Sequence, residues 1–307
     1  MKLIGHEREK VLVRRLLEKG YDSLSLLFEG VNCIGKKMLA LYAARAYLCD
    51  KREGFGCGEC KDCRLIDNTI MNVYEKSNLT PHHDLMLIQS DNSEIKIDQI
   101  REIGEFLKLK GDKGKVVIVE KAENMNTESS NAFLKTLEEP PEGTLIILTT
   151  SNQAKLIPTI LSRLKKVKFR KLGQEEVESI LLLKGIQEKK AKMLSEMADG
   201  SMCLPVYFLE NEVIYNYSKD LYRLILNPEH REGLLSLSSN LENLQPQQII
   251  KVFDIIYTLL GKDVASGKVR TELFEKFIRE YEILIKAISN GVKKKLVIEG
   301  FFLRLIQ

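Results

Sequence analysis

The chain has 307 residues, of which 44% are hydrophobic and 29% charged, and its formal net charge is +4 at pH 7. This length suits two or three domains with real cores, and so small a charge permits contact with nucleic acid without arguing for it. The first twenty residues are charged and amphipathic, unlike a signal peptide, and no apolar run approaches the roughly 18–20 residues that a membrane span needs. We therefore expect a cytoplasmic protein that makes no contact with a membrane.

Strand-like and helix-like segments alternate from about residue 23 to residue 167. Four short apolar runs are typical of buried strands, and they lie at residues 25–29, 84–88, 116–119 and 144–149. Two segments with helical periodicity lie at residues 37–48 and 127–139, the second ended by Pro140 and Pro141. This alternation predicts an α/β fold, with a parallel sheet that is covered by helices on both faces.

The remainder of the chain has only helical patterns. Two short ones, at residues 175–184 and 188–197, suit a small helical domain. Longer ones follow at residues 247–260, 271–289 and 293–305. We therefore predict an α/β domain over residues 1–168, followed by an all-α part that divides into residues 169–210 and 211–307.

A phosphate-loop motif, G-x-x-x-x-G-K, lies between the first predicted strand and the first predicted helix. Gly30, Gly35 and Lys36 are its defining residues, and we expect them to hold phosphate through backbone amides, the helix N-terminus and the lysine ammonium. The next position normally carries a Ser or Thr hydroxyl that binds Mg²⁺, but here it is Lys37. A protonated lysine is a donor only, so it cannot bind a cation.

The carboxylate pair of a working ATP site is also altered. The strand at residues 116–119 would normally end in Asp-Glu, whereas this chain has Glu120-Lys121. Lys121, in its usual protonated state, cannot act as the base for an attacking water. ATP binding is possible, and we expect either binding without hydrolysis or an empty loop.

Four cysteines form a cluster with the spacing C-x7-C-x2-C-x2-C, at Cys49, Cys57, Cys60 and Cys63. Four thiolates match a tetrahedral structural zinc site, which we favour; the C-x2-C-x2-C series also occurs in iron–sulfur proteins. The two remaining cysteines, Cys33 and Cys203, are expected to be simple core residues.

Several longer motifs carry a family resemblance: Ile4-Gly5-His6-Glu7, IDQIR at residues 97–101, NAFLKTLEEPP at 131–141 and TILSR at 159–163. With the phosphate loop and the cysteine insertion, they resemble the delta-prime family of bacterial DNA polymerase III clamp-loader subunits. They are similar, more distantly, to the gamma/tau family. The resemblance covers roughly the first two-thirds of the chain.

The resemblance implies an AAA+ fold: a RecA-like domain with a zinc insertion at residues 49–63, a helical lid and a helical collar. It implies a ring with gamma/tau and delta subunits, which acts on the sliding clamp and primer-template DNA. The family motif Ser-Arg-Cys reads Ser162-Arg163-Leu164 here, and it implies that Arg163 is supplied in trans to the ATP of a neighbouring subunit. Cys203 stands where the lid arginine of the active ATPases is expected.

Two other functions remain open from the sequence. One is an active gamma/tau-type ATPase, which would need Glu120 and another residue to replace the usual metal ligands. The other is a zinc-dependent DNA-binding module, which would need a concentrated basic surface. The basic runs at residues 165–171 and 293–295 are expected to be solvated faces, and His82-His83-Asp84 a turn that enters the sheet.

Overall fold

The computed structural model describes residues 3–75, 82–90, 94–227 and 232–306. The chain forms two compact units, Met1–Cys203 and Leu204–Gln307. The first unit contains the predicted α/β domain together with the two short helices that follow it. The three-part division at residues 168 and 210 stays a prediction.

A five-stranded parallel sheet organises the first unit. The strands are β1 (Ser23–Glu29), β2 (Leu85–Ile88), β3 (Lys115–Val119), β4 (Thr144–Thr150) and β5 (Lys165–Lys168). Their order in the sheet is β2-β3-β4-β1-β5, and every pairing is parallel. All residues of β3 and β4 are buried, as expected for apolar runs in a sheet that is covered on both faces.

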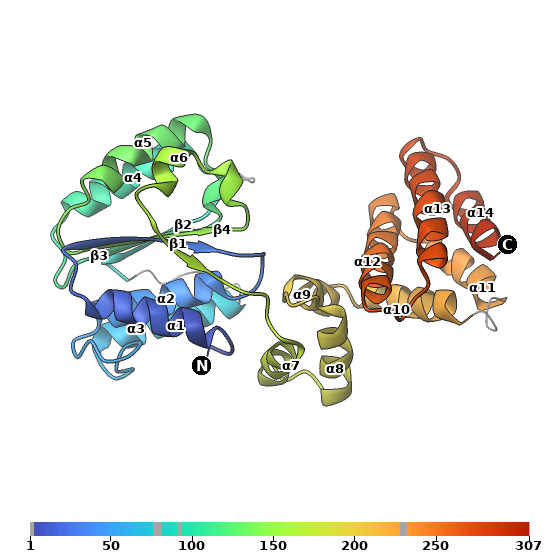
Figure 1. Ribbon diagram of the computed structural model, residues 1–307, viewed down its shortest axis with the longest axis horizontal. Coiled ribbons are helices and arrows are strands. Elements are labelled where there is room, and N and C mark those ends of the chain that lie inside the picture. Colours follow the sequence, from blue (N-terminus) through green and yellow to red (C-terminus); the bar gives the residue numbers. More distant parts are fainter. Residues whose placement is uncertain (1–2, 76–81, 91–93, 228–231, 307) are drawn as a thin grey trace. The chain divides into compact units, whose positions relative to one another are not determined.

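Helices cover both faces of this sheet (Figure 1). One face carries α1 (Glu7–Glu18), α2 (Lys36–Leu48) and α3 (Lys61–Glu75), and the other carries α4 (Ile97–Lys108), α5 (Thr127–Glu138) and α6 (Pro158–Leu161). Short 3₁₀ turns lie at Ala122–Asn124 (η1) and Gln153–Lys155 (η2). The predicted α/β architecture is confirmed.

One strand is absent from the sequence prediction. The basic run at residues 165–171 begins with β5, which pairs with β1 from Leu26↔Lys165 to Glu29↔Lys168. The basic residues of the run are exposed, as expected for a solvated face. Only Val167 of β5 is buried. An edge strand with one inward side chain has no apolar run to reveal it.

Two short helices follow the sheet, α7 (Gln174–Leu183) and α8 (Glu188–Met197), both close to their predicted bounds. We call these helices and the segment up to Cys203 the lid. It is joined closely to the segment that follows β5. The Leu172 amide donates a hydrogen bond to the Gly200 carbonyl at 2.9 Å. Gly200 has φ +72°, and a Cβ there would lie 2.8 Å from the Leu172 carbonyl oxygen, so glycine suits this close approach.

The second unit is all helical. After α9 (Cys203–Glu210) it contains α10 (Glu212–Leu226), α11 (Glu232–Leu241), α12 (Pro246–Ala265), α13 (Thr271–Ser289) and α14 (Lys294–Ile306). Phe253, Phe277 and Phe301 are fully buried at its centre, with ring centroids 4.9 and 5.4 Å from Phe301. The predicted order of an α/β part followed by an all-α part is confirmed.

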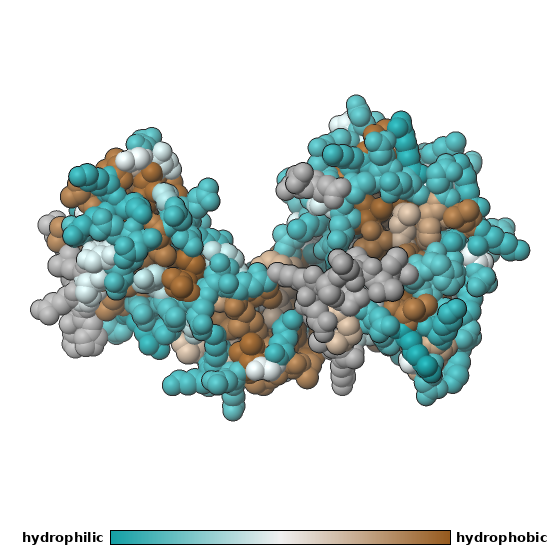
Figure 2. Space-filling view, turned by 180° about the vertical axis from the view of Figure 1, so that it is seen from behind, coloured by the Kyte–Doolittle hydropathy of each residue, from teal (hydrophilic) through white to brown (hydrophobic). Residues whose placement is uncertain are grey.

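Within the described ranges, no helix has the length and apolar character needed to cross a bilayer. Figure 2 shows hydrophilic residues over most of one face of the molecule, with smaller hydrophobic patches between them.

Candidate phosphate-loop site and cysteine cluster

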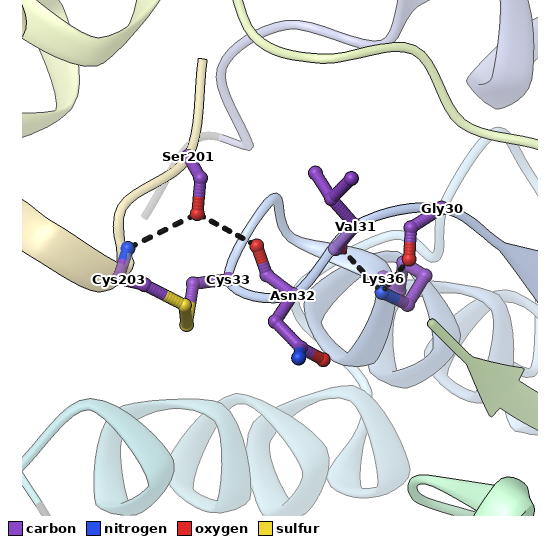
Figure 3. Close-up of a disulfide and its surroundings, with 7 residues drawn as sticks. All are labelled: Gly30, Val31, Asn32, Cys33, Lys36, Ser201 and Cys203. Carbon is purple, nitrogen blue, oxygen red and sulfur yellow. Dashed lines mark hydrogen bonds between the residues drawn. A yellow bond between two sulfur atoms is a disulfide. The ribbon is translucent and has the colours of Figure 1, made fainter. Parts of the chain in front are cut away.

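The phosphate loop lies between β1 and α2, as the sequence predicts, and it brings Gly30, Gly35 and Lys36 together. Gly35 caps α2 with φ +102°. The buried Lys36 turns back into the loop, where its ammonium donates hydrogen bonds of 2.6 Å to the carbonyl oxygens of Gly30 and Val31 (Figure 3). The groups that would hold phosphate are therefore present, but the lysine bonds the loop itself. Their binding role stays a prediction.

Burial sets the charge state of this lysine. It lowers the pKa of Lys36 to about 8, although the nearby carboxylates of Glu123 and Glu120 oppose the change. An anion that approaches a poorly hydrated lysine favours its protonated, charged form. Lys36 can therefore bind phosphate only when its hydrogen bonds to the carbonyl oxygens of Gly30 and Val31 are broken.

A second lysine takes the place of the magnesium ligand. The ammonium of Lys37 lies 2.9 Å from Glu120 Oε2, and Gln89 Nε2 donates to the same oxygen at 3.0 Å. The side chain of Lys121 is exposed, and its backbone is left-handed at φ +52°. The carboxylate at the end of β3 is therefore neutralised by a cation that belongs to the protein.

Glu123, which lies beside this group, is not marked by any motif in the sequence. Ser151 donates to Glu123 Oε1 through its amide at 2.9 Å and its hydroxyl at 2.5 Å. Burial alone would raise the pKa of Glu123, but the Ser151 hydrogen bonds outweigh it and hold the pKa below its ordinary value. Glu123 therefore remains charged near Lys36. A strand end followed by a polar turn was the only available signal.

The lid is fastened to the phosphate loop. Ser201 Oγ donates to the Asn32 carbonyl at 2.8 Å, and Cys33 and Cys203 form a disulfide (Figure 3). The Met202 amide donates to the Cys33 carbonyl at 2.9 Å. The prediction that these two cysteines are simple core residues is wrong, because both are exposed and bonded to each other. They are 170 positions apart, so only the folded arrangement of lid and loop brings them together.

His6, which precedes α1, contacts the phosphate loop. Its ring is fully buried, Nε2 donates to the Ile34 carbonyl at 2.6 Å, and the ring packs against Phe169 with centroids 5.0 Å apart. In the sequence, His6 is recognisable only as part of a family motif. Its position shows that the segment before α1 helps to fix the loop conformation.

The four clustered cysteines converge as predicted. Their sulfur atoms lie within 4.8 Å of one another, with Cys57 and Cys63 at 4.0 Å. A zinc ion with Zn–S bonds of about 2.3 Å would bring tetrahedral sulfurs to about 3.8 Å, so the cluster fits zinc with small movements. Backbone amides of Cys57, Cys60 and Cys63 donate to the sulfurs of Cys49, Cys57 and Cys60 at 3.2–3.4 Å.

These amides also affect the titration of the thiols. Burial alone would raise the pKa of Cys49, but hydrogen bonds, that of the Cys57 backbone foremost, lower it below its ordinary value. Burial raises the pKa of Cys63. Donors directed at sulfur stabilise thiolates, the form in which cysteine binds metal.

The cysteine insertion is attached to α2 through Arg45. Its Nε donates to the Phe55 carbonyl at 2.7 Å, and its guanidinium pairs with Asp67 of α3. Gly56 has φ +93°, and a Cβ there would lie 2.9 Å from Cys63 Sγ. The turn between the first two clustered cysteines therefore has little room for a side chain.

His82 and Asp84 lie in the turn that enters β2, as the sequence predicts. The Asp84 amide donates to His82 Nδ1 at 3.0 Å, so Nε2 carries the ring proton and donates to Asp62 at 3.0 Å. Burial alone would raise the pKa of Asp62, but hydrogen bonds from Lys113 and His82 lower it. These contacts link the start of α3 to the sheet.

Arg163 is paired within the chain. Its Nη2 lies 2.6 Å from Glu138 Oε1, and its Nη1 donates to the Thr159 carbonyl at 2.7 Å. Arg163 precedes β5, whereas the phosphate loop follows β1. Because Leu26 of β1 pairs with Lys165 of β5 in parallel, Arg163 and the loop lie toward opposite ends of this strand pair.

A phosphate-loop motif after the first strand of a parallel sheet, a carboxylate at the end of β3 and two short helices after the sheet together have the arrangement of an AAA+-type fold. The family model described as "DNA polymerase III, delta subunit" matches residues 5–173, more than half of the chain. The chain therefore belongs to this DNA polymerase III subunit family.

Individual relatives show which subunits of DNA polymerase III the chain is similar to. The chain is 30% identical over 191 residues to DNA polymerase III subunit delta′ of Bacillus subtilis, covering 62% of this chain and 55% of the relative. It is 36% identical over 160 residues to subunit delta′ of Pseudomonas aeruginosa, covering 50% and 45%. Subunit tau of Bacillus subtilis is 28% identical over 324 residues, covering 99% and 53%. The chain thus spans about half the length of these relatives.

A solved structure of a DNA polymerase III gamma-subunit-related protein from Thermotoga maritima is also similar. It has a TM-score of 0.46 and 20% identity, and the match covers 96% of this chain and 97% of that one.

Proposed function

We propose that the chain is a delta-prime-type subunit of a DNA polymerase III clamp loader. In this role it works in the cytoplasm with gamma/tau and delta subunits, and through that complex it acts on the sliding clamp and primer-template DNA. Family membership and the two delta′ relatives support this assignment.

The observation that carries the proposal is the ion pair between Lys37 and Glu120 at 2.9 Å. A hydrolysing site needs a divalent cation at this carboxylate to neutralise charge on the phosphates. Here the Lys37 ammonium already satisfies Glu120, and Lys36 is held by its own loop. Our proposal is therefore that this loop does not hydrolyse ATP.

We propose that Arg163 is the residue through which this chain promotes ATP hydrolysis, and that it does so in the ATP site of a neighbouring subunit. Its charge is permanent, and its forked donors match phosphate oxygens. Its position away from the chain's own loop favours action in trans. Glu138 supports this role because it holds the guanidinium in one orientation.

Zinc is the proposed metal of Cys49, Cys57, Cys60 and Cys63, and it supplies a structural cross-link when bound. Four thiolates leave no open position for substrate. The neighbouring Arg45 contacts then fix the insertion against α2 and α3.

The second unit is proposed to be the collar through which subunits assemble. Its surface includes large apolar side chains on several helices: Tyr257, Ile283, Leu296 and Leu303 are exposed by 41%, 48%, 63% and 53%. Exposed residues of this kind on a helical unit suit contacts with other helical units.

The match to subunit tau covers 99% of the chain. A gamma/tau-type ATPase is therefore the alternative function that the experiments must distinguish. Two measurements separate the functions. Clamp loading onto primed DNA should require this chain when the loader is reassembled from its subunits. The isolated chain should turn over ATP no faster than a Lys36→Ala control. Turnover above that control would establish the alternative, and loading that proceeds equally well without the chain would refute the clamp-loader role.

A further inference from the structure

A covalent bond and two hydrogen bonds join residues 201–203 to the phosphate loop, and Figure 3 shows the covalent bond and the hydrogen bond from Ser201. The bond joins Cys33 to Cys203, Ser201 Oγ donates to the Asn32 carbonyl at 2.8 Å, and the Met202 amide donates to the Cys33 carbonyl at 2.9 Å. The two hydrogen bonds can break and re-form freely, but the disulfide cannot open without a chemical reaction. The disulfide is therefore the element that decides whether the loop can separate from the lid segment.

In the fastened loop the Lys36 ammonium is not free to meet a phosphate. The Lys36 ammonium bonds the carbonyls of Gly30 and Val31, whereas a bound phosphate needs that ammonium together with outward-facing loop amides. Cys33 itself has φ +56°, a left-handed conformation that a residue with a Cβ seldom adopts. The disulfide therefore ties the backbone of the same loop from which Lys36 must be released before it can reach a phosphate.

We propose that Cys33 and Cys203 are a reversible redox pair that controls access to the phosphate loop. The disulfide form keeps the loop closed, and the dithiol form admits a nucleoside polyphosphate. This inference rests on the proposed cytoplasmic function, and it gives the non-hydrolysing loop a regulated occupancy.

Exposure and surroundings suit thiol–disulfide exchange at this pair. Both cysteine residues are exposed, as exchange with a small thiol or disulfide requires. The N-terminal end of α2, which begins at Lys36, favours negative charge near Cys33 and thus its thiolate. In a reducing compartment, long-lived structural disulfides are rare and those present are mostly transient or redox-sensing.

The chemistry balances with a small-molecule disulfide as oxidant. One protein thiolate attacks RSSR, forms a mixed disulfide and releases one thiolate RS⁻. The second protein thiolate then attacks the mixed disulfide at the protein sulfur, which forms the Cys33–Cys203 bond and releases the second RS⁻. The two protein thiols lose two protons and two electrons, and RSSR becomes two RSH. Reduction by two RSH reverses both steps.

The test uses the full zinc-loaded chain equilibrated in glutathione buffers, either reduced or oxidised. Peptide mapping should find Cys33 linked to Cys203 in the oxidised buffer and both free in the reduced one. Binding of a fluorescent ATP analogue should then be at least about tenfold weaker for the oxidised chain, because the fastened loop is open in only a small fraction of molecules. Cys203→Ser, whose position lies outside the phosphate loop, should bind alike in both buffers, with the affinity of the reduced wild type.

Two results would overturn the inference. One is that both thiols remain separately modifiable in the oxidised buffer. The other is that the oxidised and reduced wild type bind the analogue equally, including the case in which neither binds. Clamp loading by the reassembled complex is a separate measurement, so failure of this inference is distinguishable from failure of the clamp-loader role.

Discussion

Lys37 at the start of α2 and Glu120 at the end of β3 form an ion pair of 2.9 Å, and Gln89 holds the same carboxylate oxygen from the end of β2. Lys37 is the residue after the phosphate-loop lysine, and Glu120 occupies the position of a metal-binding carboxylate. Lys37 thus stands where a hydroxyl that binds Mg²⁺ is expected, and its ammonium supplies the positive charge that Mg²⁺ would bring to Glu120.

Replacing Lys37 by Thr should make the loop responsive to magnesium. The variant restores a hydroxyl and frees Glu120, so Mg²⁺ should strengthen binding of an ATP analogue by the reduced chain, which is measured by titration with and without the ion. The free energy of unfolding should change by less than about 1 kcal/mol, because a partly exposed pair contributes little.

Lys37→Arg is the matched control, since it keeps a cation beside Glu120 and should show no magnesium effect. Stronger binding of the analogue by the wild type on addition of Mg²⁺ would contradict the view that Lys37 has replaced the ion.

The affinity of the reduced chain for the same analogue should depend on pH through Lys36. Its pKa is lowered to about 8 by burial, and only the protonated form attracts phosphate. Affinity should therefore be level below about pH 8 and fall as the pH rises above it. Lys36→Arg keeps its charge throughout this range and should flatten the profile; a flat wild-type profile would show that Lys36 does not contact the phosphates.

The fold was largely predictable because its strands are continuous apolar runs. Strand β4 is wholly buried and was apparent as residues 144–149. Strand β5 was not predicted, because its sequence KKVK has a single buried residue, Val167, and its pairing with β1 depends on tertiary contact. Local pattern reveals an element only where burial is on two faces or on a regular stripe.

The candidate site was also predictable only in part. The motif spacing brought Gly30, Gly35 and Lys36 together, and the spacing of four cysteines predicted a cluster that the structure assembles. The Cys33–Cys203 bond lay beyond such reasoning, because it depends on the return of the lid to the loop after 170 residues. The Lys37–Glu120 pair could have been proposed, since a lysine and a glutamate both replace metal-site residues.

The cysteine cluster should bind about one equivalent of zinc per chain, and Cys60→Ser should lose it. Removal of zinc by a chelator should disorder the insertion at residues 49–63, since metal binding of this kind contributes about 10–16 kcal/mol to local folding. Metal analysis and hydrogen exchange would measure both effects, and the strands β3 and β4 should remain protected.

Cys33→Ser is the control for this experiment, because it removes a cysteine outside the cluster and should retain the metal. Full zinc content in Cys60→Ser, or equal zinc loss in both variants, would contradict the assignment of the four ligands.

The position of Arg163 should matter as well as its charge. Glu138 and the Thr159 carbonyl hold its two terminal nitrogens at 2.6 and 2.7 Å, which fixes the direction of the guanidinium. Arg163→Ala should lower the DNA-stimulated ATPase of the reassembled loader, since arginine fingers accelerate phosphoryl transfer by about 10³–10⁵-fold in GTPases. Arg163→Lys should restore only part of the loss, because an ammonium cannot make forked contacts with phosphate.

Glu138→Gln separates positioning from charge, because it leaves Arg163 in place and weakens only the group that holds it. Its ATPase should lie between those of the wild type and Arg163→Ala, and its free energy of unfolding should fall by no more than about 1 kcal/mol, as for other exposed pairs. Size-exclusion chromatography should show intact complexes for all variants. Wild-type ATPase in an intact Arg163→Ala complex would mean that the Glu138 pair is only a surface salt bridge.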